Sequence, residues 1–461
     1  MTVVAGANTV AAQGASAGDR SALIARIDSL IADHLSNGPA ASAAVAVVRG
    51  NDTLLMRGYG LADRIATRAA GPTTVYEIGS ITKQFTAAAV MRLVERGKIA
   101  LDDDLSKFAP SVPLQSRHVT IRQLLNHTSG IRSYTSKREW AATWDQDLAP
   151  DSIVAFVARD TFDFAPGTQW RYNNTGYVLL GMVIEAASGT SYATYLDEQF
   201  FKPLGLKQTR YCPSHAPDTS FAAGYSVRNK ELVPATYLSM THPFSAGALC
   251  STVRDYVVWQ RALHGGRVVS ARSYEQMTMP DTLNTGARLS YGFGLSSGQL
   301  GTHRMIAHGG GINGFTTAQL YFPADSLSVI VFTNTDAAGP DQAAMNIARA
   351  ALGMPLVAAA PRTQPLVALD TRERDKLLGT YDLATPTGGK LTVRVFLDGQ
   401  VLTTQAEGPG QGAIPLRHSG NNVFGASFDP SLRITFVSEN GAVVRLRLAQ
   451  GGAVLEGPRR P

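Results

Sequence analysis

The chain has few cysteines and no long uninterrupted run of apolar residues. Only two of its 461 residues are cysteine, Cys212 and Cys250, so a framework of several disulfides is excluded. The pair is compatible with a single disulfide and also with two buried free thiols. No stretch of about 18 apolar residues occurs, so no segment is predicted to cross a membrane as a helix.

Runs of one charge sign and the short motifs of cofactor sites are also missing. The net charge is +6, but the Lys and Arg residues are scattered without a basic run, which argues against a nucleic-acid partner. There is no His-Glu-x-x-His, no Cys-x-x-Cys and no phosphate-loop Gly-Lys-Ser/Thr motif. We therefore predict no metal and no nucleotide cofactor.

The first 18 residues carry no charged side chain and consist largely of Ala, Val, Gly, Thr and Ser. They end in the small-x-small triplet Ala15-Ser16-Ala17, which is typical of the end of a secretory signal, here without its basic start. A disordered, low-complexity terminus fits the same composition. The first interpretation favours a periplasmic or secreted protein, and a cytoplasmic protein is the alternative.

Residues 19–353 show the patterning of one α+β domain. Apolar residues at helical spacing predict a helix over residues 19–37, and two alternating segments around the turn Gly50-Asn51-Asp52 predict a β-hairpin. The segment 80–95 is too apolar for a surface helix, so a buried helix is predicted there. After a mainly helical middle, two strands and a closing helix are predicted at residues 316–322, 328–333 and 341–352. This order favours one sheet whose first and last strands are distant in the chain.

The remainder of the chain has a different composition. Residues 354–369 are rich in Pro and Ala and lack periodicity, which is typical of a linker. Residues 370–461 contain short alternating strands with hairpin turns such as Asn440-Gly441. We predict that they form a small all-β domain, either a barrel or a sandwich.

One serine has a lysine at the spacing that can activate a nucleophile. A serine hydroxyl is a poor nucleophile at neutral pH and needs a nearby base. Ser80 and Lys83 lie three residues apart in a predicted helix, so their side chains share one face. Ser80 would begin that helix, where backbone N–H groups favour a developing oxyanion. A capping serine followed by a surface lysine is the alternative, because a lone Ser-x-x-Lys match is weak.

Two further elements strengthen the catalytic interpretation. The chain contains a single Ser-x-x-Lys and a single Tyr-x-Asn, which is Tyr172-Asn173-Asn174 in a predicted turn before a helix. A phenol at that place could project into a cleft. A third element, His308-Gly309-Gly310-Gly311, leads into the strand pair predicted at residues 316–333.

In these motifs the chain resembles the serine β-lactamase and penicillin-binding-protein-like superfamily, specifically its class C-like branch of esterases, D-aminopeptidases and D,D-peptidases. Five segments match in order: GSITKQFTAAAVMRLVERGKIALDDDLSKFAP around Ser80, LLNHTSGI from Leu124, FAPGTQWRYNNTGYVLLG around Tyr172, FKPLGL from Phe201 and HGGGINGF from His308. The resemblance implies the β-lactamase/transpeptidase-like fold, an antiparallel sheet flanked by helices with a mainly helical second lobe.

The resemblance also implies a role for each motif. Ser80 would be the nucleophile, Lys83 its base and Tyr172 a second proton carrier. The backbone N–H groups of Ser80 and Gly311 would form the oxyanion hole. Asn174 would act as a donor to the substrate's amide or to Lys83. The residues that the resemblance places against the substrate are Asn174, His308, Gly309 and Gly310.

One departure from the family pattern concerns the substrate. The β-lactamases of the family and many of its penicillin-binding proteins carry Lys-Thr-Gly where this chain has His308-Gly309-Gly310. A neutral His lacks most of the attraction of a lysine for a carboxylate. We therefore expect a serine hydrolase that forms an acyl-enzyme on esters or on D-amino-acid amides and peptides, with weak or no β-lactam turnover. A penicillin-binding, acyl-accepting sensor and a true class C-like β-lactamase are the alternatives.

Two rival motifs are rejected. Gly309-x-Gly311-x-x-Gly314 matches a dinucleotide fingerprint, but strand-like residues follow it where a helix is required. The Gly-x-Ser-x-Gly match at residues 14–18 has no strand before it.

The resemblance also suggests which segments surround the cleft. The segment His127–Gly130 is expected to support the cleft structurally, and the pocket walls are expected at residues 134–148 and 211–244.

Overall fold

The structure is a computed structural model, and it describes most of the two predicted domains. The described residues are 17–37, 40–160, 162–212, 219–228, 231–337, 339–357, 369–384, 390–398, 401–407, 414–418, 422–425, 433–450 and 453–460. The first 16 residues and most of the predicted linker lie outside this part. No described helix is both long and apolar enough to cross a bilayer.

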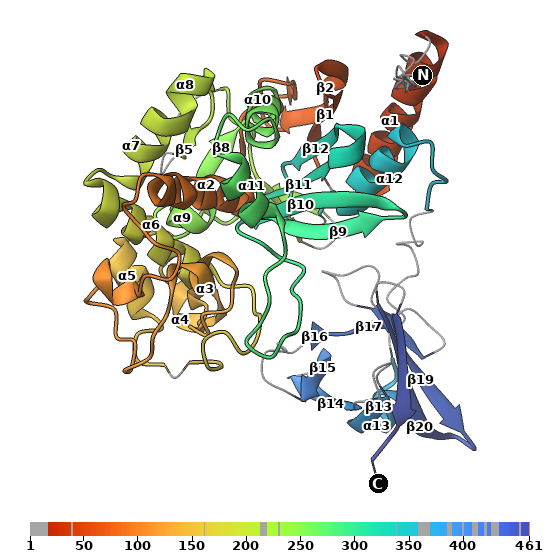
Figure 1. Ribbon diagram of the computed structural model, residues 1–461. Coiled ribbons are helices and arrows are strands. Elements are labelled where there is room, and N and C mark those ends of the chain that lie inside the picture. Colours follow the sequence, from red (N-terminus) through yellow and green to blue (C-terminus); the bar gives the residue numbers. More distant parts are fainter. Residues whose placement is uncertain are drawn as a thin grey trace, which may run out of the picture.

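A seven-stranded antiparallel sheet forms the centre of the first part of the chain (Figure 1), in the order β3-β2-β1-β12-β11-β10-β9. β1 pairs with β12 along its length, with Ala43 opposite Thr333, so the predicted sheet of distant strands is confirmed. The strands are β1 (Ser42–Arg49), β2 (Asp52–Asp63), β3 (Arg68–Ala69), β9 (Ser296–Leu300), β10 (His303–Ile312), β11 (Phe315–Phe322) and β12 (Leu327–Thr333).

Helices cover both faces of this sheet. Alternate residues of β1 point to opposite faces, so the strand contributes side chains to two separate cores. Val45 and Val47 pack with Ile27 of α1 (Ala17–Asn37) and Ile347 of α12 (Asp341–Ala351). Ala44, Ala46 and Val48 belong to the larger core on the other face, which also contains residues of α2 (Thr82–Glu95) and α10 (Val253–His264). The predicted α+β fold with flanking helices is therefore confirmed.

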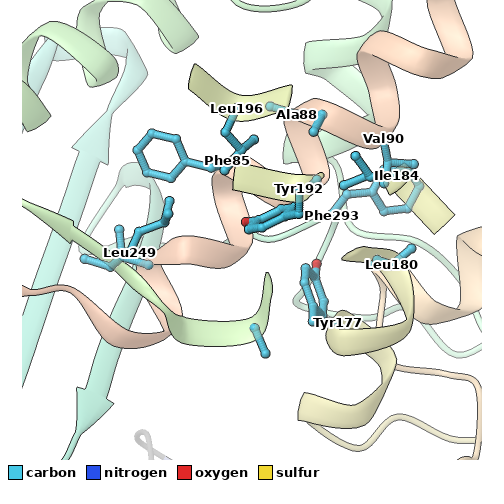
Figure 2. Packing of buried hydrophobic residues seen from close by; sticks show 14 of the residues in the cluster. Phe85, Ala88, Val90, Tyr177, Leu180, Ile184, Tyr192, Leu196, Leu249 and Phe293 are labelled. Atoms are coloured by element: carbon cyan, nitrogen blue, oxygen red, sulfur yellow. The ribbon is translucent and has the colours of Figure 1, made fainter. Parts of the chain in front are cut away.

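Helix α2 is the buried helix predicted for residues 80–95, and it connects the sheet to the helical lobe. Phe85 stacks on Trp259 of α10 with ring centroids 3.8 Å apart. Figure 2 shows part of the same buried cluster, to which Phe85, Ala88 and Val90 of α2 belong together with Tyr177, Leu180 and Ile184 of α6 (Asn174–Ser188). The other helices are α3 (Ile121–Leu125), α4 (Arg138–Ala141), α5 (Pro150–Ala155), α7 (Tyr192–Leu196), α8 (Lys202–Leu204), α9 (Phe244–Gly247) and α11 (Ala271–Thr278).

Two small sheets complete this part of the chain. In the first, β4 (Tyr76–Glu77) and β5 (Arg210–Tyr211) lie on either side of β8 (Leu249–Ser251). In the second, β6 (Tyr225–Arg228) pairs with β7 (Glu231–Pro234). β4 ends just before Ser80, so the three-stranded sheet holds the segment that leads into the predicted nucleophile.

The C-terminal part is all-β after one short helix, α13 (Thr371–Lys376), as predicted. Its nine-stranded sheet has β16 and β17 as its two edges, and only Leu416 separates them in the chain. The sheet therefore curves until its edges meet, as in a barrel. Its strands are β13 (Gly379–Ala384), β14 (Lys390–Asp398), β15 (Val401–Glu407), β16 (Ile414–Pro415), β17 (Arg417–His418), β18 (Val423–Gly425), β19 (Arg433–Glu439), β20 (Ala442–Gln450) and β21 (Ala453–Pro458).

The boundaries 19–353, 354–369 and 370–461 stay a prediction, which a truncation tests. A protein that ends at residue 367 should fold and keep a reactive Ser80, because the two cores of the first part contain no described residue after Met354. Thermal unfolding and labelling with a serine-reactive phosphonate measure both properties against the full chain. A folded, soluble truncation that cannot be labelled would show that the division is wrong.

Candidate active site

Ser80 lies in a tight turn rather than in the first turn of the predicted helix. This 3₁₀ turn (Gly79–Ile81) precedes α2, and Gly79 has a φ of +51°, a conformation that glycine adopts readily. A Cβ atom on Gly79 would lie 2.9 Å from the backbone nitrogen of Gly311 on β10. The Ser80 turn and β10 are therefore in direct contact, and a side chain at position 79 would separate them.

Glycines on β10 permit this contact from the other side. A Cβ atom on Gly310 would lie 2.1 Å from the carbonyl oxygen of Ile78, which also accepts a 3.1 Å hydrogen bond from Thr317. We propose the N–H groups of Ser80 and Gly311 as the oxyanion hole on this ground. That Gly309 and Gly310 contact the substrate stays a prediction.

Lys83 is fully buried, and its amine has three polar neighbours. Its Nζ lies 3.0 Å from Ser80 Oγ, donates to Asn174 Oδ1 at 2.9 Å and donates to the carbonyl oxygen of Ala246 at 2.8 Å. No carboxylate of the described residues pairs with it, and burial lowers its pKa well below the usual value. A neutral amine has two N–H bonds and one lone pair. The two donations leave the lone pair for the Ser80 hydroxyl, which is the arrangement of a general base.

Tyr172 lies beside this pair, just before α6. Its phenolic oxygen is buried and has no hydrogen-bond partner in the described part of the chain, and Lys83 Nζ lies 4.7 Å from the centre of its ring. Burial raises the pKa of Tyr172, and the nearby Ser80 side chain opposes this. The phenol therefore keeps its proton at neutral pH. We propose it as the second proton carrier, which donates and recovers a proton without becoming a stable phenolate.

Asn174 and its neighbour Asn173 fix the start of α6. The Asn173 side chain caps the helix by accepting from the N–H of Gly176 at 2.7 Å. Asn174 Oδ1 faces Lys83, as described above, and its Nδ2 donates to Thr135 at 3.3 Å. Asn174 thus accepts from Lys83 rather than donating to it, which corrects one of the two roles expected for it. Its contact with the substrate stays a prediction.

His127 supports the segment that carries Tyr172. It has a φ of +64°, its Nδ1 accepts the N–H of Asn173 at 3.1 Å, and its carbonyl oxygen accepts the N–H of Arg171 at 3.0 Å. Its ring packs 4.4 Å from that of Tyr172. Burial lowers the pKa of His127 well below its usual value, with smaller effects from Lys83 and His308. The ring is therefore neutral, and its contacts are those of a supporting residue.

His308 is also neutral. Its Nδ1 lies 2.6 Å from the carbonyl oxygen of Gly309, and its Nε2 lies 2.8 Å from the Tyr291 hydroxyl. A carbonyl only accepts, so Nδ1 donates and Nε2 accepts from Tyr291. Burial, with a smaller contribution from Lys83, lowers the pKa of His308 to about 4. The position therefore presents no cation to a substrate at neutral pH, although its contact with a substrate stays a prediction.

A buried carboxylate holds the loops around the site. The Asp163 side chain is 5% exposed and pairs with Arg132 and Arg171, which precede Ser133 and Tyr172. Ser133 Oγ in turn accepts the N–H of Asn174 at 3.2 Å. Asp163 thus connects two loops of the site, and no spacing in the sequence indicated this. Ala246 was missed for a similar reason, because it acts through its backbone.

The two cysteines form a disulfide beside the site. Cys212 follows β5, and Cys250 lies on β8 opposite Glu77 of β4. The N–H of Ile78 donates to the carbonyl oxygen of Leu249 at 2.9 Å. The bridge therefore belongs to the small sheet that holds the chain leading into the Ser80 turn.

Residues 27–354 match the model of a known protein family that is described as "Beta-lactamase". The chain belongs to this family. It is 30% identical over 380 residues to penicillin-binding protein 4* of Bacillus subtilis, which covers 77% of this chain and 83% of that protein. It is also 30% identical over 321 residues to a D-aminopeptidase of Brucella canis, which covers 68% of this chain. The chain spans 60% of the length of that D-aminopeptidase.

Solved structures extend the family likeness over nearly the whole chain. The octameric penicillin-binding protein homologue from Pyrococcus abyssi is 25% identical, with a TM-score of 0.67, and the match covers 94% of this chain and 99% of that one. The β-lactamase family fold and its serine hydrolase class are thereby confirmed for this chain. The roles of the individual residues in the chemistry are proposed from the geometry described above.

Replacement of Lys83 tests the proposed base. Lys83→Ala should lower kcat/KM by at least about a hundredfold, because Ser80 loses its proton acceptor. Lys107→Ala is the matched control, since Lys107 is exposed and contacts only its local neighbours Asp103 and Phe108 among the described residues. Near-normal activity of Lys83→Ala would remove this residue from the mechanism.

The pH dependence should carry the same signature. Protonation consumes the lone pair of Lys83, so kcat/KM should fall as the pH falls through its lowered pKa and should level off above it. The acid limb should vanish, together with most of the activity, in Lys83→Ala. A wild-type profile that rises only near the usual pKa of a lysine would contradict the neutral amine.

Proposed function

We propose that the protein is a serine hydrolase that forms an acyl-enzyme on Ser80 and releases D-amino acids from amides or short peptides. Esters are further substrates. The observation that carries the proposal is the buried amine of Lys83, which is aimed at the Ser80 hydroxyl. The relatives named penicillin-binding protein and D-aminopeptidase support the substrate class.

The reaction proceeds in two steps. Lys83 takes the Ser80 proton while Oγ bonds to the substrate's carbonyl carbon, and the negative charge on the carbonyl oxygen faces the N–H groups of Ser80 and Gly311. The C–N bond then breaks, and the amine leaves with a proton delivered through Lys83 and Tyr172. Water attacks the acyl-enzyme in the second step, and its proton returns through the same pair to Ser80.

Weak or absent β-lactam turnover is part of the proposal. β-lactams carry a carboxylate, and a cation in the place of His308 would attract it. The neutral ring of His308 is held by Tyr291 and Gly309 and offers no such charge. This supports amides and esters that have no carboxylate at that position over β-lactams, so a true β-lactamase is the second candidate.

A substrate panel on two proteins tests the function. Wild type should hydrolyse D-alanine p-nitroanilide and p-nitrophenyl acetate over many turnovers and nitrocefin slowly or not at all. Ser80→Ala should lose hydrolysis and phosphonate labelling. Retained labelling would refute the nucleophile, and a burst of one equivalent without turnover would favour the acyl-accepting sensor. Fast nitrocefin hydrolysis would favour the β-lactamase.

We also propose that the protein is periplasmic or secreted. The disulfide supports this, because such bridges persist in oxidising compartments. Cell fractionation with alkylation of free thiols should find the protein outside the cytoplasm, with neither cysteine alkylated because both are in the disulfide. A cytoplasmic pool with two reactive thiols would contradict this location.

A further inference from the structure

Trp170 is the exposed member of an aromatic cluster around Tyr172. Its side chain is 40% exposed. Its ring meets the His127 ring nearly edge-on, with centroids 6.1 Å apart, and lies 6.1 Å from the Tyr291 ring. Those two rings lie 4.4 and 6.4 Å from the ring of Tyr172. A continuous set of rings therefore leads from the proposed proton carrier to the surface of the protein.

The loop that carries Trp170 is held firmly on both sides. The N–H of Gly167 donates to the Thr128 carbonyl at 2.8 Å, and the Gly167 carbonyl accepts the N–H of Asn284 at 2.9 Å. Immediately after Trp170, the N–H of Arg171 donates to the His127 carbonyl at 3.0 Å. The exposed indole is therefore a pre-positioned surface, and ordering it costs little when a ligand binds.

The proposed reaction indicates which part of a substrate lies near Tyr172. Tyr172 is the proposed carrier of the proton that the departing amine takes up, so the leaving group must come beside its hydroxyl. Trp170 is two residues away and contacts the same rings. An exposed aromatic side chain that is linked to Tyr172 through these rings can stack on a planar group of a substrate.

On the basis of the proposed function, we infer that Trp170 forms a wall of the leaving-group subsite. It favours amides and esters whose leaving amine or alcohol carries an aromatic or large apolar group. The interaction exists only while the leaving group is bound. It therefore acts on acylation, in which the C–N or C–O bond breaks, and not on hydrolysis of the acyl-enzyme.

Two substrates with the same acyl group isolate this effect. D-alanine p-nitroanilide and D-alaninamide both give the D-alanyl-enzyme but release p-nitroaniline and ammonia, respectively. The measured quantity is the kcat/KM for the p-nitroanilide divided by the kcat/KM for D-alaninamide. Trp170→Ala should lower this ratio by roughly tenfold, the scale of one aromatic stacking interaction. Trp170→Phe should keep most of the ratio, and Trp170→Leu should give an intermediate value.

Comparison of the two substrates distinguishes recognition of the leaving group by Trp170 from structural support of Tyr172. If Trp170 merely holds Tyr172 in place, both kcat/KM values will fall together and the ratio will not change, which overturns the inference. Ile65→Ala is the matched control, because Ile65 is also a large exposed apolar residue, at 84% exposure. Its ratio should equal that of wild type.

A pair of esters keeps the test independent of the acyl group. Phenyl acetate and methyl acetate share an acetyl-enzyme and differ in the same way in their leaving groups. If wild type hydrolyses neither D-alanine substrate, the proposed substrate class fails, and the ester ratio still measures the role of Trp170. An ester ratio unchanged in both Trp170→Ala and Trp170→Leu would overturn it. Thermal unfolding identifies a misfolded Trp170→Ala, in which case Trp170→Leu and Trp170→Phe carry the comparison.

Discussion

The site depends on one constraint, the burial of the Lys83 amine away from any carboxylate of the described residues. An unpaired ammonium inside a protein is costly, so the amine is stable there in its neutral form. Its two acceptors come from α6 and from the turn of α9, and Ser80 comes from the turn before α2. The packing of these helices therefore creates the base. Exposure of the amine to water would restore its proton, because burial is what lowers its pKa.

A second constraint is the contact between β10 of the central sheet and the Ser80 turn. The run of glycines on β10 and Gly79 on the turn meet it from both sides, since a Cβ atom at Gly79 or Gly310 would collide with the opposite backbone. The disulfide and the small sheet hold the chain that leads into the turn. These features act on the backbone, and a backbone N–H is what an oxyanion hole requires.

The aromatic residues around Tyr172 give the site its low polarity. Their rings bury the phenol and the His127 and His308 rings, and the same burial keeps both histidines uncharged. The histidines near Tyr172 and the Lys83 amine therefore carry no charge at neutral pH, and the site suits substrates without a carboxylate at that position. Trp170 extends this set of rings to the surface, where we propose that the leaving group departs.

Local patterns in the sequence determined the elements and the main chemistry. The Ser-x-x-Lys spacing placed Ser80 and Lys83 on one face, and the strands at both ends of the first domain predicted the sheet that pairs β1 with β12. The three-dimensional fold alone decided the rest. The neutrality of Lys83, the two occupied nitrogens of His308 and the ion pairs of Asp163 depend on groups far apart in the chain, so no local pattern reveals them. Burial sets pKa values, and burial is a property of the packed molecule.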